Sequence, residues 1–245
     1  MRKIALTAAL ALTALAVAAP SALAVNSILK FEASVVGKAG SKKKPRAVGL
    51  KIRPFYDTLA PDSEAPFAWS EATVHLPKEL VFNPKQFPKC TVAQAKTASG
   101  RSGACKKAEI GKVNAKGFAL GLVEPLVVGM YNGSVTNTVL LYLKGDSPVI
   151  IDHVVTGKLK KVSGKYGWEL TFAVPADLQQ PAPGAWATVL DFKAEVKSRS
   201  ARKGKKTYPY TGLTGCGTGK LNFGFSTKNS DGTTTLVELT SPCKK

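Results

Sequence analysis

The side chains best suited to acid–base chemistry near neutral pH are two histidines, His75 and His153. The alternating pattern around each predicts a strand, with His153 on the buried face and His75 on the solvent face. Asp152 precedes His153, but consecutive side chains of a regular strand point to opposite faces, so this pair predicts no catalytic dyad. We therefore interpret His153 as a hydrogen-bonded core residue and His75 as a solvated surface residue.

The usual catalytic and metal-binding motifs are missing from the sequence. It contains neither a G-x-S-x-G elbow nor an H-E-x-x-H zinc motif. The glycine-rich stretch 212–219 includes a cysteine and precedes no predicted helix, which indicates a turn rather than a phosphate loop. Asp57, Asp62 and Glu64 come nearest to a calcium loop, but without its spacing. The sequence thus predicts no catalytic residue, no metal site and no cofactor.

The first 24 residues have the pattern of a secretory signal peptide. Arg2 and Lys3 precede an uncharged, mostly apolar run from residue 4 to residue 19, and Ala22-Leu23-Ala24 is a small-x-small cleavage site. The apolar run is shorter than the about 20 residues that a membrane span needs, so a retained anchor is the less favoured alternative. We expect cleavage after Ala24 and a secreted or extracytoplasmic chain of residues 25–245.

Four cysteines follow the signal, an even number that predicts two disulfides in an exported protein. Three connectivities are open. The local one, Cys90–Cys105 with Cys216–Cys243, is the simplest because each pair closes one compact segment. A zinc site is disfavoured because no two cysteines have C-x-x-C spacing.

Alternation of apolar and polar side chains predicts an all-β fold for residues 25–245. Residues 29–35 and 48–53 alternate clearly, and the charged segment 37–46 between them indicates a hairpin tip. One apolar and one polar face per strand is typical of antiparallel sheets. We therefore expect an antiparallel β-sandwich of roughly eleven strands, with a barrel as the second possibility and one helical turn at 91–96.

The same pattern places particular residues. Trp168 and Trp186 fall on apolar strand faces, so we expect both in the core. Residues 76–111 contain three prolines and two of the cysteines and break the alternation, which predicts a disulfide-closed excursion loop from the sheet. The chain is interpreted as a single domain, with a subdomain boundary near 175–184 as the alternative.

Residues 76–111 also resemble a segment of secreted actinobacterial proteins. The shared pattern is a Leu-Pro-x-x-Leu-x-Phe-Asn stretch, a Phe-Pro-x-Cys step, a second cysteine and an Ile-Gly strand. Here it is carried by Leu76-Pro77, Leu80, Phe82-Asn83, Phe87-Pro88, Cys90, Cys105 and Ile110-Gly111. The resemblance implies a secreted, β-rich fold. It implies no activity, because that family has no assigned function or catalytic residues.

The chain is strongly basic. Its formal net charge is +19, and loss of Arg2 and Lys3 with the signal leaves +17. Most cations are lysines, which act as hydrated point charges rather than planar forks, so the composition favours diffuse attraction to polyanions or simple solubility. Two basic runs, 42–46 and 197–206, contain no aromatic side chain for base stacking, which argues against nucleic acid as partner.

The leading hypothesis is a secreted, non-enzymatic protein whose basic runs bind an anionic cell-wall polymer or a membrane surface. The candidate contacts are Lys42, Lys43, Lys44, Arg46, Arg199, Arg202, Lys203, Lys205 and Lys206. The alternative is a secreted hydrolase acting on envelope polysaccharide or peptide, with acidic residues or His153 at its site. Basic runs that meet at one end of the fold favour the first hypothesis, whereas opposed runs indicate mere solvation.

Overall fold

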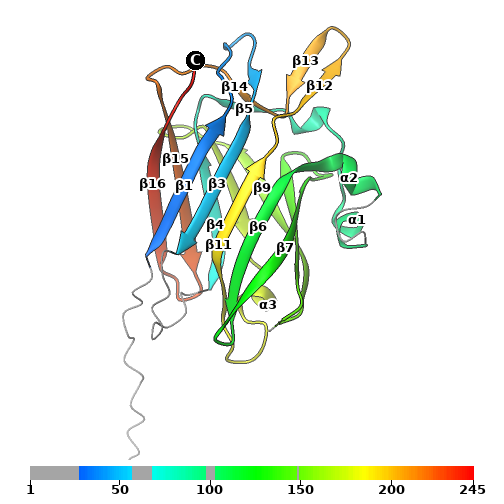
Figure 1. Ribbon diagram of the computed structural model, residues 1–245, viewed down its shortest axis with the longest axis vertical. Coiled ribbons are helices and arrows are strands. Elements are labelled where there is room, and N and C mark those ends of the chain that lie inside the picture. Colours follow the sequence, from blue (N-terminus) through cyan, green and yellow to red (C-terminus); the bar gives the residue numbers. More distant parts are fainter. Residues whose placement is uncertain (1–27, 57–67, 98–102, 148) are drawn as a thin grey trace, which may run out of the picture.

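The computed structural model describes residues 28–56, 68–97, 103–147 and 149–245, and it confirms the all-β class. Eleven strands form one antiparallel sheet, in the spatial order β1-β3-β11-β6-β7-β8-β9-β10-β4-β15-β16 (Figure 1). In chain order they are β1 (Leu29–Val36), β3 (Gly49–Tyr56), β4 (Trp69–Leu76), β6 (Glu109–Ala119), β7 (Leu122–Asn132), β8 (Thr138–Gly145), β9 (Ile151–Lys161), β10 (Trp168–Ala173), β11 (Ala187–Val196), β15 (Lys220–Asn229) and β16 (Thr234–Pro242).

Smaller elements lie around this sheet. A three-stranded sheet consists of β2 (Arg46–Ala47), β14 (Thr211–Leu213) and β5 (Leu80–Phe82). The strands β12 (Ser200–Lys203) and β13 (Lys206–Pro209) form a separate hairpin. The helices are η1 (Pro84–Gln86), α1 (Val92–Thr97), α2 (Ala104–Ala108) and α3 (Ala176–Gln179). The expected helical turn at 91–96 is confirmed as α1. The predicted signal peptide, residues 1–24, and the acidic trio Asp57, Asp62 and Glu64 lie outside the described residues.

The large sheet curls until its two edge strands, β1 and β16, lie beside each other (Figure 1). Every pairing along the sheet is antiparallel, and β1 and β16 run in the same direction. In the described residues no backbone ladder joins these two edges. Side chains close the gap, since Phe31 of β1 stacks on Phe225 of β15 with ring centroids 5.7 Å apart. The predicted disulfide Cys216–Cys243 is confirmed and holds the end of β16. The sheet is therefore nearly closed.

Alternation along each strand separates an apolar interior from a polar outer surface. In β6, Val113 and Ala115 are buried, whereas Lys112, Asn114 and Lys116 are exposed. Burying an apolar side chain contributes about 25 cal/mol per Å² of area removed from water, so the inward set stabilises the curl. The expectation of half-buried antiparallel strands is confirmed.

The excursion predicted for residues 76–111 covers part of the outer surface. In β8, Val139 and Leu141 face the interior, while Leu140 and Tyr142 face outward and are equally buried. The outward pair packs beneath α1 and α2, which the confirmed disulfide Cys90–Cys105 holds together. This cover explains why β8 is apolar on both faces.

The structure places one of the two tryptophans differently from the sequence prediction. Trp168 faces the core and packs edge-on against Phe82, with centroids 5.3 Å apart. Trp186 is 48 % exposed, so its predicted core position is wrong. A β-bulge between Val189 and Asp191 inserts one residue into β11, and such a shift moves the preceding side chains to the other face.

Residues 175–184, considered above as a subdomain boundary, form α3 and its flanking turns. The strands on either side of this segment, β10 and β11, belong to the same sheet.

Candidate functional site

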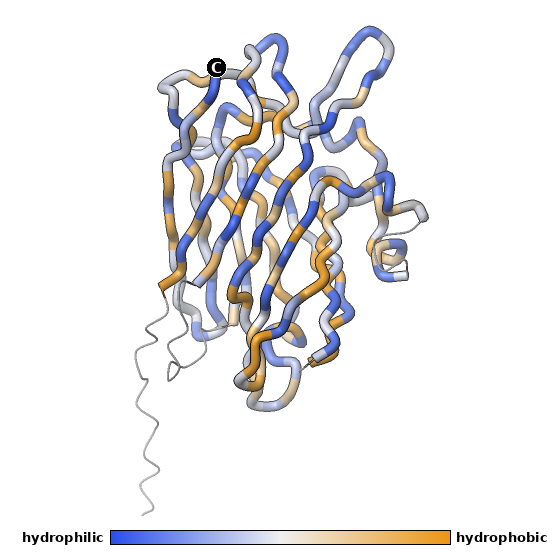
Figure 2. Tube along the Cα trace, in the orientation of Figure 1, coloured by the Kyte–Doolittle hydropathy of each residue, from blue (hydrophilic) through white to orange (hydrophobic). Residues whose placement is uncertain are grey.

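The two basic runs of the sequence lie at the same end of the fold (Figure 1). The first is the turn between β1 and β2, and the second includes the β12–β13 hairpin. Figure 2 shows both as hydrophilic loops at the upper end of the chain. We call the exposed cations on these loops the basic end. They are Lys42, Lys43, Lys44, Arg46, Arg202, Lys203, Lys205 and Lys206.

A single glycine of β14, Gly212, brings the two loops together. A Cβ atom on Gly212 would lie 2.6 Å from Pro209 Cγ, at the end of the second loop, and 3.0 Å from Pro45 Cβ, in the first. Only glycine permits so close an approach without displacing one of the prolines. Arg46 also pairs with Leu213 in the β2–β14 ladder, which fixes the first loop at its base.

The cations of the basic end carry no neutralising partner in the described part of the chain. None of the eight takes part in an ion pair there, whereas Lys51, Lys144, Lys165 and Lys197 each pair with a carboxylate elsewhere. Like charges gathered on two adjoining loops repel one another and create a positive potential that attracts anions.

Arg199, the ninth candidate contact, has a different position. It is half-buried, its guanidinium donates to the backbone oxygens of Glu109 and Lys107, and it lies 5.8 Å from the Phe87 ring centroid. Its contacts fix the base of the hairpin to the main sheet. Arg199 is therefore a positioning residue for the basic end.

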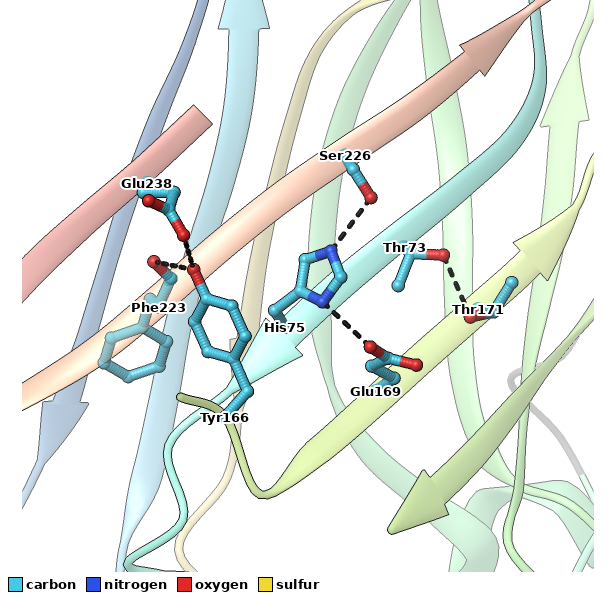
Figure 3. Close-up of polar contacts among 8 residues, drawn as sticks. All are labelled: Thr73, His75, Tyr166, Glu169, Thr171, Phe223, Ser226 and Glu238. Carbon is cyan, nitrogen blue, oxygen red and sulfur yellow. Dashed lines mark hydrogen bonds and ion pairs between the residues drawn. The ribbon is translucent and has the colours of Figure 1, made fainter. Parts of the chain in front are cut away.

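A second polar cluster lies on the outer surface of β4, β10 and β15 (Figure 3). His75 Nε2 is 2.9 Å from Ser226 Oγ, and His75 Nδ1 is 3.3 Å from Glu169 Oε1. The order serine, histidine, carboxylate is that of an activated nucleophile, its base and the group that orients the base. His75 lies on the outer face of β4, as predicted, but its side chain is only 15 % exposed, so the expected solvation is wrong.

Tyr166 covers this cluster. Its ring stacks on His75 at 5.0 Å, and its hydroxyl donates to Glu238, which Lys165 Nζ also contacts at 2.7 Å. Burial and the Glu238 carboxylate raise the pKa of Tyr166, while the contacts with Lys165 and Tyr166 lower the pKa of Glu238. Gly224 lies beneath the Tyr166 hydroxyl and leaves room for it.

The serine of this cluster lies within a regular central strand. Ser226 lies within β15, paired to Thr73 on one side and to Leu236 on the other, so its backbone N–H belongs to a ladder. An oxyanion hole needs N–H donors that are free to point at the reacting oxygen. The contacts of His75 with Ser226 and Glu169 join three neighbouring strands. The members of the cluster are far apart in the sequence, and only the strand register brings them together.

We expect Gly224→Ala to lower the free energy of unfolding by about 1 kcal/mol. The new Cβ would lie 2.7 Å from the Tyr166 hydroxyl and 3.3 Å from His75 Cδ2, so Tyr166 must leave its place. Urea denaturation measures the change. Gly215→Ala is the matched control, because a Cβ there meets no atom within 4 Å. Equal stability of the two variants would contradict the covering role of Tyr166.

His153 lies on the inner side of β9, as predicted, but is only half-buried. Its side chain is 33 % exposed, and Nδ1 lies 3.5 Å from Asp177 Oδ2 of α3. Asp152 points outward, so the predicted separation of these two neighbours is confirmed.

The described residues contain no group of three or more histidines, cysteines or carboxylates that could hold a metal ion. None of the helices in the same residues is long and apolar enough to cross a membrane. The resemblance of segment 76–111 to secreted actinobacterial proteins stays a prediction. No family model matches the chain, and no curated protein and no solved structure matches it either.

Proposed function

We propose that this protein is secreted and non-enzymatic and that it binds an anionic cell-surface polymer through its basic end. The two disulfides indicate an oxidising, extracytoplasmic compartment, and the N-terminal pattern of a cleaved signal peptide supports export. A cell-wall polymer is the anion that such a protein meets at high concentration.

The observation that carries the proposal is that the two loops bearing the basic runs approach each other at Gly212. Lys44 and Lys203 are far apart in the sequence, yet their loops adjoin. Crowding like charges is unfavourable in the free protein, and a polyanion relieves that repulsion when it binds. Loops that merely kept the protein soluble would have no reason to adjoin.

The predominance of lysine over arginine at the basic end favours a polymeric ligand over a small anion. Six of the eight cations at the basic end are lysines, exposed on a turn and on the β12–β13 hairpin rather than in a shaped pocket. Such side chains follow a repeating, flexible polyanion better than they recognise one small phosphate or carboxylate. Attraction of this kind weakens as salt screens the charges.

The test is sedimentation of the protein with purified bacterial cell envelope at rising salt. We expect binding at low ionic strength and release as salt is added. Replacing six lysines of the basic end with glutamine is expected to weaken binding by about 100-fold or more. The six are Lys42, Lys43, Lys44, Lys203, Lys205 and Lys206.

The matched control neutralises six exposed lysines on the strands instead, which removes the same charge from elsewhere. These are Lys112, Lys116, Lys158, Lys160, Lys161 and Lys193. We expect the control to bind within a few-fold of the unchanged protein. Equal losses in both variants would mean that net charge, not the basic end, attracts the envelope, and would overturn the proposal. Sedimentation with anionic lipid vesicles but not with the polymer would do the same.

The second candidate is a secreted hydrolase, favoured by the order Ser226, His75, Glu169. A fluorophosphonate probe would then label Ser226 covalently, and Ser226→Ala would abolish the label. Our proposal expects no labelling at Ser226, because no free N–H donors face its hydroxyl. Stoichiometric labelling would favour the hydrolase.

A further inference from the structure

The nearly closed sheet encloses an apolar cavity of about 190 Å³. Small inward residues create this space, among them Ala72 of β4 and Ala115 and Gly117 of β6. Larger side chains such as Phe172 and Leu141 line the rest. A cavity of about 150 Å³ with similar walls accommodates a molecule of benzene's size, so this one is large enough for a ligand.

The cavity extends toward the end of the fold opposite the basic end, and exposed apolar side chains surround it there. Its lining includes Ala119, Ile151 and Ala187, and each has large, exposed apolar neighbours within four positions along the chain. We call these neighbours the apolar rim. They are Leu120, Leu122, Val123, Ile150 and Trp186. Single exposed apolar residues are common, but several grouped at the mouth of one cavity indicate a binding site. Figure 2 shows the apolar turn between β6 and β7 at this lower end.

The backbone at Leu120 gives independent support. Leu120 and Gly121 form the two-residue turn between β6 and β7, with φ angles of 53° and 78°. This turn favours asparagine at its first position, and a leucine there is strained. An exposed leucine in a strained conformation stabilises nothing in the fold. Its side chain is better explained by contact with an apolar ligand.

Polar groups at the mouth restrict which part of a ligand can enter. Glu124 is buried in the lining, where its Oε1 accepts a hydrogen bond from the Ser147 N–H at 3.0 Å. Its carboxyl group disfavours an anionic head inside the cavity. Helix α3 lies at the same mouth, with Leu178 turned into the lining and Asp177 near His153. A ligand therefore enters tail first.

We propose that this cavity binds the alkyl tail of a single-chain amphiphile, which enters through the apolar rim and leaves its head there. This function is separate from polymer binding, because the rim and the basic end lie at opposite ends of the fold (Figure 1).

The test uses a series of straight-chain primary alcohols from hexanol to dodecanol, measured by titration calorimetry on the mature protein. We expect one site per chain, with affinity rising about fourfold per added methylene until the cavity is full. Bound alcohol should also raise Tm, since it binds only the folded state. Affinity that is independent of chain length would overturn the proposal.

Two substitutions separate cavity binding from general adhesion. Ala115→Leu fills part of the cavity and is expected to weaken binding at least tenfold without lowering Tm. Ala173→Leu, on the exposed face of β10, adds the same atoms outside and should bind as before. If Ala115→Leu fails to fold, Gly117→Val replaces it, because a Cβ there meets only ordinary contacts, the nearest at 3.5 Å. Unchanged binding in the filled variant would refute the cavity as the site.

Leu120→Asn tests the rim. We expect Tm to rise by about 2 °C as the turn strain is relieved, while uptake of the alcohol slows several-fold. Faster or unchanged uptake would exclude Leu120 from the path.

A further experiment tests whether the amphiphile comes from a bilayer or from solution. It uses lysophosphatidylcholine, supplied either as dissolved monomers or within phosphatidylcholine vesicles. Transfer from the vesicles identifies a bilayer source, whereas binding of dissolved monomers alone identifies a free amphiphile. Binding of neither form would overturn the proposal. The variant that lacks six lysines at the basic end should bind the alcohols normally, so this site and the polymer site can fail separately.

Discussion

Asn132→Ala is expected to lower the free energy of unfolding by about 3 kcal/mol. The side chain is 1 % exposed, and its Nδ2 donates to the backbone oxygens of Pro84 at 3.0 Å and Pro88 at 2.9 Å. Its Oδ1 accepts from the Tyr210 hydroxyl at 3.4 Å. One amide therefore joins β7 to the excursion and to the base of the basic end. Alanine would leave several buried polar groups without a partner and open a small void.

Urea denaturation measures the loss, with Asn114→Ala as the control. Asn114 lies exposed on β6, so its replacement should change stability by less than about 0.5 kcal/mol. Fluorescence and circular dichroism should report the same midpoint if the excursion and the sheet unfold together. A loss below about 1 kcal/mol for Asn132→Ala would mean that the excursion contributes little to the stability of the sheet.

The double variant Cys216→Ala/Cys243→Ala is expected to lose about 3.5 kcal/mol, the larger of the two disulfide effects. The bond closes a segment of 27 residues, and in the chain-entropy model the stabilisation grows with the length that is closed. It also ties the end of β16, an edge strand, to the segment that follows β14. Without it, β16 keeps a ladder only with β15.

Cys90→Ala/Cys105→Ala provides the comparison, with an expected loss of about 3 kcal/mol for a closed segment of 15 residues. Hydrogen exchange distinguishes the two variants. Amides of β16 should lose protection in the first, and those near α1 in the second. A Cys216/Cys243 variant as stable as the unchanged protein would show that the unfolded chain gains no freedom when this bond is lost.

Local patterns predicted much of the fold. The alternation at residues 29–35 and 48–53 corresponds to β1 and β3, which pair directly across the basic turn. The break in alternation at 76–111 corresponds to the excursion, and the local cysteine pairing was the correct one. These features depend on neighbours in sequence, so a periodic pattern is enough to predict them.

Long-range register accounts for what the sequence did not show. Nothing around Ser226 or Glu169 indicates that both flank His75, because the three meet only through the pairing of β15, β4 and β10. Trp186 was misplaced because a bulge shifts the alternation by one residue. The cavity was equally hidden, since Ala72 and Ala115 leave space only where their strands face each other.

The basic end was predictable in part: its residues follow from the local sequence, but the approach of its two loops depends on the fold. Each basic run is recognisable in the sequence as a charged turn, so the candidate contacts could be named from the local sequence alone. The approach of Pro45 and Pro209 to Gly212 could not be predicted, because no local signal distinguishes this glycine from one in an ordinary turn. Nothing in the sequence distinguishes Arg199 from the other cations of its run, because its contacts with Glu109 and Phe87 depend on the fold.

The number of strands in the large sheet has a consequence of its own. Eleven strands arranged around a ring form an odd cycle, and alternating directions cannot be maintained all the way round an odd cycle. One neighbouring pair must run the same way, and here that pair is β1 and β16. Every other strand of the sheet has a ladder on both sides, so this seam concentrates the unpaired backbone groups in one place. At one end of this seam, the disulfide Cys216–Cys243 and the hydrogen bond from the Ala39 N–H to the Lys244 oxygen hold the edges together. We therefore expect the sheet to open first along that seam.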